Sequence, residues 1–142
     1  MHPEIHLLIR LLVAAALAAL LGWERESARK AAGLRTHMLV GIAAALYTAI
    51  AELAVSDIPP NSEGFQADPI RAVQAVAIGI GFLGSGVIFV SRHEDRVHGL
   101  TTAASVWATA AIGIAAGLEF YRLALGATLL LLLVLRVMSH LD

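Results

Sequence analysis

Five apolar segments, each long enough to cross a lipid bilayer, account for most of this 142-residue chain. They run over Ile5–Trp23, Leu34–Val55, Ile70–Val90, Leu100–Leu118 and Tyr121–Met138. About 20 helical residues, at a rise of roughly 1.5 Å each, match the roughly 30 Å hydrocarbon thickness of a membrane. Hydrophobic residues make up 58% of the chain and charged residues only 15%, which is more apolar surface than a soluble domain of this length can bury. We therefore predict an all-α integral membrane bundle of five transmembrane helices. It forms a single transmembrane domain over residues 1–142 and contacts the lipid bilayer.

The charged residues between these segments predict how the chain is oriented. Basic residues follow the first and third segments, at Arg25, Arg29, Lys30, Arg35, Arg92 and Arg96. The loop over residues 56–68 carries only acidic charges. Because Lys and Arg gather on the cytoplasmic side, we expect the N-terminus outside and the C-terminus in the cytoplasm. No basic stretch precedes the first segment, which is expected to be a retained helix rather than a cleaved signal. The net charge of −1 does not indicate a nucleic-acid partner.

Small residues form a row along the fourth segment. They recur every four residues, at Thr101, Ser105, Thr109, Gly113 and Gly117. In lipid, helices are held together by close approach of small side chains and by shared hydrogen bonds. We expect this row to face outward from a monomer and to mediate helix packing. Together with a similar row in the second segment, it predicts a homo-oligomer.

The third segment contains four glycines, Gly79, Gly81, Gly84 and Gly86, next to Ser85. Glycine costs about 1 kcal/mol relative to alanine in a helix interior, so a plain helix would not accumulate it. Two interpretations are open. The glycines either pack tightly against a neighbouring helix, or they break the helix near the membrane midplane, as in transporter binding sites.

Polar side chains at the outer membrane face form one candidate site. Asp68, Arg71 and Gln74 share one face of the third helix near its outer end. Either Asp68 caps its own helix while Arg71 extends to the headgroups, or the three residues line an outward-facing polar pocket. Arg10 lies about one turn inside the first helix and is expected to reach the lipid headgroups.

A second candidate site lies at the cytoplasmic ends of the helices. Its members are Glu24, Arg25, Glu26, Arg35, Thr36 and His37. Glu24, Arg25, Arg35 and His37 could form a charged network, and the alternative is a solvated loop that follows the charge rule. Thr101 and Thr102 offer hydroxyls that cap or open the fourth helix.

Signals for a metal centre or an enzyme are weak. His93 and His98 are five residues apart with no helix evident, which does not fit the zinc-protease motif. Asp68, Glu24 and Glu26 offer carboxylates to a hard cation such as Mg²⁺, but neighbouring arginines compete for them, so no metal site is assigned. The chain has no cysteine, and no histidine is placed to activate a serine. We expect no cofactor and no enzymatic activity.

Three separate motifs resemble those of the MgtC/SapB family of bacterial membrane proteins. The first comprises Glu24–Glu26 and Lys30–Val40, the second Asp68–Arg71, Gln74 and Gly79–Gly86, and the third Val97–Ala104, Trp107, Ala110–Gly113 and Gly117. They occur in the family's order, within a resemblance that runs from about Leu11 to Val134.

The resemblance implies a bacterial inner-membrane protein that serves survival at low magnesium and, in pathogens, inside macrophages. The best-known member is described as acting on the F-type ATP synthase rather than as a magnesium transporter. That member carries a cytoplasmic domain after the bundle, and we expect a short form without it here.

Two classes of function follow. In the first, the bundle is a regulatory binding protein whose small-residue rows dock on a membrane complex such as the F-type ATP synthase. In the second, it is a transporter or channel for a cation, a proton or a small solute, favoured by the glycine-rich third helix and the polar residues at its outer end. Five helices with no visible inverted repeat are few for a transporter, so we prefer the first class.

Overall fold

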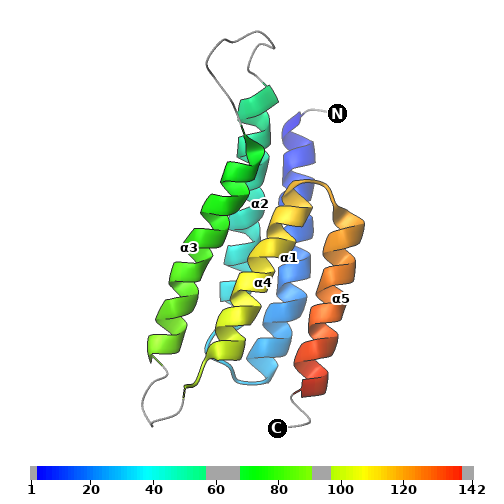
Figure 1. Cartoon of the computed structure of the whole chain (residues 1–142). Coiled ribbons are helices and arrows are strands. Elements are labelled where there is room, and N and C mark those ends of the chain that lie inside the picture. Colours follow the sequence, from blue (N-terminus) through cyan, green and yellow to red (C-terminus); the bar gives the residue numbers. More distant parts are fainter. Residues whose placement is uncertain (1–2, 57–67, 91–96, 139–142) are drawn as a thin grey trace.

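The computed structural model describes residues 3–56, 68–90 and 97–138, and all the regular secondary structure within these ranges is α-helical. The helices are α1 (Pro3–Ser27), α2 (Leu34–Ser56), α3 (Pro69–Val90), α4 (Leu100–Gly117) and α5 (Tyr121–Met138). The ends of each helix lie within a few residues of the ends of a predicted apolar segment (Figure 1). The all-α prediction is therefore confirmed.

Four of these helices are long and apolar enough to cross a membrane. The four spans are Glu4–Ser27, Leu34–Ser56, Ile70–Ile88 and Leu100–Gly117. Helix α5 is not among them, although it packs beside α1 and α4. Helix α1 begins and α5 ends at opposite ends of the bundle, which is the arrangement that five crossings require (Figure 1). The fifth crossing and the orientation of the chain stay predictions.

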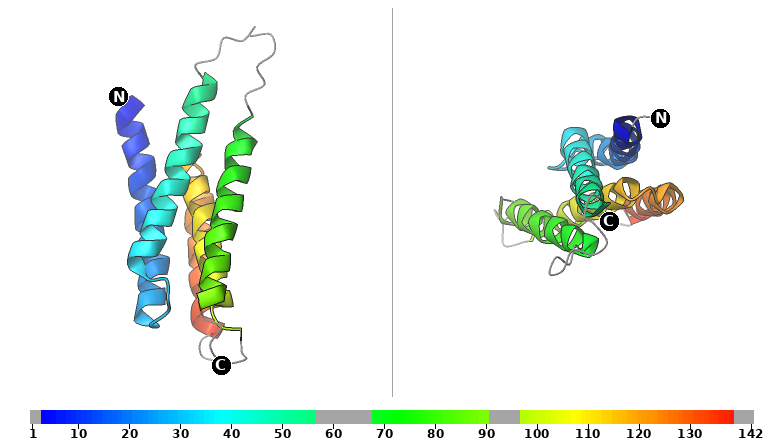
Figure 2. Two further views of the ribbon diagram at one scale, coloured as in Figure 1. Left: turned by 90° about the vertical axis from the view of Figure 1, so that its left-hand side faces the viewer. Right: turned by 90° about the horizontal axis from the view of Figure 1, so that it is seen from above.

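Helix α4 occupies the centre of the bundle and contacts each of the other four helices. Helices α3 and α5 lie on opposite flanks, where α3 contacts α2 and α4 while α5 contacts α1 and α4 (Figure 2). This arrangement buries most of α4 and leaves much of α3 and α5 exposed. The exposed side chains on α3 and α5 are mainly large and apolar, as expected for helices that face lipid.

Small residues allow α2 and α4 to approach each other at backbone distance. A Cβ atom added to Gly113 would lie 2.9 Å from the Cβ of Ala44, and one added to Gly117 would lie 2.7 Å from the carbonyl oxygen of Ala45. The row of small residues predicted on the fourth helix is buried from its second member onward, and only Thr101 is exposed. The expectation that this row faces outward from a monomer is wrong, because α4 is the central helix and uses the row against α2.

The glycines of α3 fit neither sequence-based interpretation. Helix α3 runs without a break from Pro69 to Val90, so it is not interrupted near the midplane. A Cβ atom added to Gly79, Gly81 or Gly86 would meet no heavy atom within 4 Å. Of the four, only Gly84 packs against a neighbour, with Ala103 3.6 Å from such an atom. The glycine-rich surface of α3 is therefore uncovered over the part of the chain that the structure describes.

Candidate functional site: two polar clusters at opposite ends of the bundle

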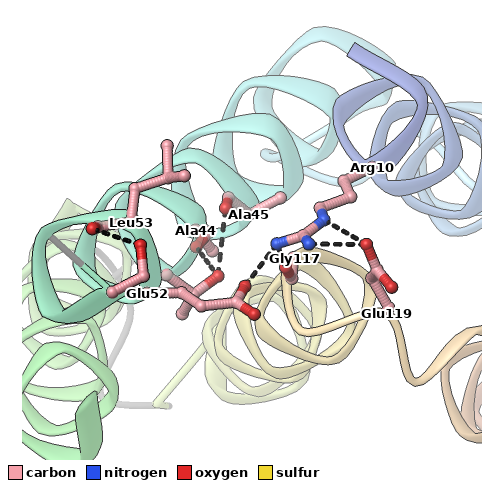
Figure 3. Close-up of polar contacts among 9 residues, drawn as sticks. Arg10, Ala44, Ala45, Glu52, Leu53, Gly117 and Glu119 are labelled. Atoms are coloured by element: carbon pink, nitrogen blue, oxygen red, sulfur yellow. Dashed lines mark hydrogen bonds and ion pairs between the residues drawn. The ribbon is translucent and has the colours of Figure 1, made fainter. Parts of the chain in front are cut away.

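The first cluster joins Arg10 of α1 to two glutamates from distant parts of the chain. The Arg10 Nε atom donates a 2.8 Å hydrogen bond to Glu119, while Nη1 donates to Glu52 of α2 and, at 3.0 Å, to the carbonyl oxygen of Gly117 (Figure 3). The Arg10 side chain is 13% exposed, whereas those of Glu52 and Glu119 are about half exposed. We call these three residues the Arg10 cluster. Arg10 is therefore paired within the bundle, and its predicted level at the lipid headgroups stays a prediction.

The backbone around Glu119 supports this arrangement. Glu119 connects α4 to α5 and has a φ of 65°, a left-handed conformation that non-glycine residues seldom adopt. The turn is closed by backbone hydrogen bonds from Glu119 to Ala116 and from Phe120 to Ala115. Sequence reasoning missed both glutamates of the cluster. The available signal was the general tendency of intramembrane charges to pair.

The second cluster lies where α1 ends and comprises Glu24, Arg25, His37 and Ser105. We call it the Arg25 cluster. His37 is completely buried, its Nδ1 atom lies 2.9 Å from the carbonyl oxygen of Gly33, and its Nε2 atom lies 3.3 Å from the hydroxyl of Ser105. Helix α1 packs closely on His37, since a Cβ atom added to Gly22 would lie 3.0 Å from the His37 Cβ, and Glu24 and Arg25 are buried just beyond Gly22. Three helices, α1, α2 and α4, therefore contribute to one buried polar centre.

Counting hydrogens leaves two forms of the imidazole, both with a hydrogen on Nδ1. A carbonyl oxygen only accepts, so Nδ1 must carry a hydrogen and donate it to Gly33. The Ser105 hydroxyl lies 2.8 Å from the carbonyl oxygen of Thr102 and has a single hydrogen to give. When that hydrogen goes to His37 the ring is neutral. When it goes to Thr102, the contact with Ser105 requires a hydrogen on Nε2 as well.

The charged pair in this cluster is incompletely satisfied. Arg25 is 3% exposed and Glu24 8%. The Arg25 Nη1 atom and the Glu24 Oε2 atom are 3.6 Å apart, beyond ordinary hydrogen-bond distance. Within the described ranges, the Nε and Nη2 atoms of Arg25 and the Oε2 atom of Glu24 are buried with no hydrogen-bond partner. Buried polar atoms are rarely left in this state, so this pair is the most unusual chemical feature of the bundle.

The other residues predicted at the cytoplasmic ends do not join this centre. Glu26 accepts a 2.8 Å hydrogen bond from the backbone nitrogen of Leu34 and so caps α2. Arg35 and Thr36 are exposed, so the predicted four-residue network lacks Arg35. Thr102 is buried beside the cluster.

The predicted polar pocket at the outer end of α3 does not form among the described residues. Asp68 accepts a 2.9 Å hydrogen bond from the backbone nitrogen of Ile70, which is the geometry of a helix cap. Arg71 and Gln74 are exposed and line neither of the described cavities. Asp68 therefore caps α3, which is the first of the two interpretations given above.

In the part of the chain that the structure covers, no three or more His, Asp or Glu side chains are grouped so that they could hold a metal ion. His93 lies outside the described residues, and His98 is exposed. Of the carboxylates considered above for Mg²⁺, that of Glu24 faces Arg25, that of Glu26 caps α2 and that of Asp68 caps α3.

The interior between the two clusters is closed. The hydroxyls of Thr48 and Thr109 donate to carbonyl oxygens of their own helices, at 3.0 Å and 2.8 Å. Between them, Gly113 and Gly117 pack directly on the backbone of α2. Helices α2 and α4 therefore meet backbone to backbone between the two clusters.

An apolar groove of about 560 Å³ opens between α2 and α3. From α2 it is lined in part by Leu39, Ala43 and Tyr47, and from α3 by Ala72, Ala75, Gly79 and Leu83. Three of the six α3 residues that line the groove, Ala72, Ala75 and Gly79, are small.

Comparison with known proteins identifies the family. The model of the MgtC family matches residues 11–142. The chain belongs to the MgtC family. No solved structure matches it.

Three relatives show how much of an MgtC-family protein this chain covers. It is 39% identical over 135 residues to "Putative magnesium transporter YhiD" of Escherichia coli K12, which is 95% of this chain and 61% of that protein. It is 40% identical over 138 residues to an uncharacterized protein of Haemophilus influenzae, covering 96% and 57% of the two chains. It is 40% identical over 125 residues to "Protein MgtC" of Salmonella typhimurium LT2, covering 88% and 49%. The chain thus spans about half to three fifths of the length of these relatives.

Proposed function

We propose that this MgtC-family protein is a regulatory binding protein of the bacterial inner membrane that docks on a transmembrane helix of another membrane complex. The uncovered groove between α2 and α3 is the observation that carries the proposal. Small residues such as Ala72, Ala75 and Gly79 in its lining would let a second helix approach closely and make extensive van der Waals contact. Gly79 lies in the groove with no neighbour within 4 Å, which leaves room for such an approach.

The closed interior favours binding over conduction. A conducting bundle needs a polar path between its two ends, but the backbones of α2 and α4 meet between the Arg10 cluster and the Arg25 cluster. Self-association, which the sequence predicts, cannot use the internal row on α4, and the exposed face of α3 offers an alternative surface for it. We propose the F-type ATP synthase, under magnesium limitation, as the target complex, in line with the family resemblance.

The test uses inverted membrane vesicles with and without the protein, in which ATP hydrolysis and proton-gradient formation are recorded together. We expect both to fall when the protein is present. The Gly79→Leu variant, which fills the groove, should abolish the effect. Gly81→Leu is the matched control, because Gly81 is equally uncovered but does not line the groove.

A transporter or channel is the alternative, and the buried charges of the Arg25 cluster favour it. Ionisable groups inside a membrane often mark ion pathways, and the related YhiD protein is named a putative magnesium transporter. In the same vesicles, a gradient that falls while hydrolysis holds or rises would mean that the protein leaks ions. That result would overturn the regulatory proposal.

A further inference from the structure

We propose that the Arg25 cluster is a binding site for one small oxyanion that still carries a proton, such as hydrogen phosphate. The two unpartnered nitrogens of Arg25, Nε and Nη2, lie on the same edge of the guanidinium plane. This edge binds two oxygens of a phosphate or carboxylate group through parallel hydrogen bonds. Within the described chain, these two nitrogens are covered by protein atoms but receive no hydrogen-bond acceptor.

The neighbouring carboxylate sets the protonation of the ligand. The Glu24 Oε2 atom lies 3.6 Å from Arg25 Nη1 and has no donor of its own among the described residues. A fully deprotonated anion would be repelled there, whereas a ligand hydroxyl would donate to this oxygen. The site therefore combines two donors with one acceptor, and hydrogen phosphate satisfies all three.

The surroundings support an anionic ligand. Arg29, Lys30 and Arg35 are exposed at the same end of the bundle and make its potential positive. Trp23, 66% exposed, precedes the pair. Such a position suits the headgroup level of a membrane. Phosphate can therefore come from solution or from a lipid headgroup.

The cluster is enclosed, which predicts slow exchange. Both free nitrogens of Arg25 are buried, so the ligand reaches them only when the ends of the helices separate briefly. A cavity of about 140 Å³ between α1, α4 and α5 is lined in part by Leu21 and by Ser105, the residue that contacts His37. Its volume is several times the roughly 30 Å³ that one water occupies in the liquid.

The first measurement is phosphate binding by the full chain in phosphatidylcholine nanodiscs. In a Trp107→Phe background, the only tryptophan is Trp23, which is two residues from Arg25. Inorganic phosphate should change its emission and raise the thermal unfolding temperature more than sulfate does at equal ionic strength, because sulfate carries no proton at neutral pH. Equal effects of phosphate and sulfate would overturn the proposal.

Two substitutions locate the site. Arg25→Lys keeps the charge but lacks the two-donor edge, and should weaken phosphate binding about tenfold or more. Arg29→Gln removes an exposed charge nearby and should change the affinity for phosphate less than about twofold. Equal affinities in Arg25→Lys and the parent would also overturn the proposal. Should Arg25→Lys fail to fold, Glu24→Gln decides, because it should abolish the preference for phosphate over sulfate.

The source of the phosphate group is tested in a second arm. Nanodiscs that contain phosphatidic acid, without added phosphate, should stabilise the protein in an Arg25-dependent way if the headgroup is the natural ligand. Stabilisation by inorganic phosphate alone would identify a soluble ligand. If neither produces an Arg25-dependent shift, the free nitrogens hold water and no oxyanion site exists.

Discussion

Two arginines that are largely shielded from solvent, Arg10 and Arg25, have different partners within the bundle. Arg10 is neutralised by Glu52 and Glu119 and also donates to a backbone carbonyl, so its hydrogen-bonding capacity is largely used. Arg25 lies deeper and faces a single carboxylate at 3.6 Å. An unpaired charge at the membrane centre costs about 2.5–3.5 kcal/mol on insertion scales. The paired arginine is therefore suited to hold helices together, and the incompletely paired one to bind a ligand.

Replacing Arg10 by glutamine should destabilise the bundle by about 1–2 kcal/mol, because two half-exposed carboxylates are left facing each other without a cation. The measurement is thermal unfolding in mild detergent at low and at high salt. Arg122→Gln is the control, since Arg122 is exposed near the start of α5. High salt should reduce the difference in unfolding temperature between the two variants, because screening weakens exposed ion pairs. Equal stabilities at low salt would contradict this structural role of Arg10.

At the scale of elements, the two glycine-bearing helices serve different purposes. In α4 the small residues pack against α2, and there is no room for a side chain at Gly113. In α3 most of the glycines are uncovered, and the helix remains continuous because neighbouring residues keep its backbone hydrogen bonds. Identical residue types thus mark an internal contact in one helix and a free surface in the other.

Gly113→Leu should prevent α2 and α4 from packing and should cost about 3 kcal/mol or more, at the upper end of overpacking effects. The measurement is the fraction of folded protein after extraction in mild detergent, from size-exclusion chromatography and protease resistance. Gly126→Leu on α5 is the matched control, because a Cβ atom there meets nothing within 4 Å. A folded, native-sized Gly113→Leu protein would show that the α2–α4 contact is not as close as described.

At the scale of the whole molecule, the bundle is asymmetric. The central helix α4 is surrounded, one flank carries the apolar groove of α2 and α3, and the other carries α5 (Figure 2). The two polar clusters lie at opposite ends of α1. A partner helix and a soluble ligand would therefore meet different parts of the protein.

The predicted orientation can be measured directly because the chain has no cysteine. Single substitutions at exposed positions, Ser27→Cys after α1, Ser56→Cys after α2 and Val137→Cys near the end of α5, are labelled with a membrane-impermeant maleimide in whole cells and in inverted vesicles. We expect Ser56→Cys to react from outside and the other two from the cytoplasm. If Val137→Cys reacts on the same side as Ser56→Cys, α5 does not cross the membrane.

The apolar segments alone determined the all-helical fold and the approximate bounds of all five helices, because a run of about 20 apolar residues has few alternatives in lipid. The cap at Asp68 was also within reach, since it depends on residues two positions apart. The motifs of residues 24–40, 68–86 and 97–117 were sufficient to indicate the family.

Tertiary structure decided which surfaces face inward and which charges meet. Because α4 lies at the centre, its small residues face inward, and because α3 lies on a flank, three of its four glycines are uncovered. Arg10 meets Glu119 across 109 positions of sequence, and His37 meets Ser105 across 68. The periodicity of the sequence predicts which residues share one face of a helix, but it does not predict which helix packs against that face. In lipid, the choice of neighbouring helix depends on side-chain fit between helices rather than on hydrophobicity.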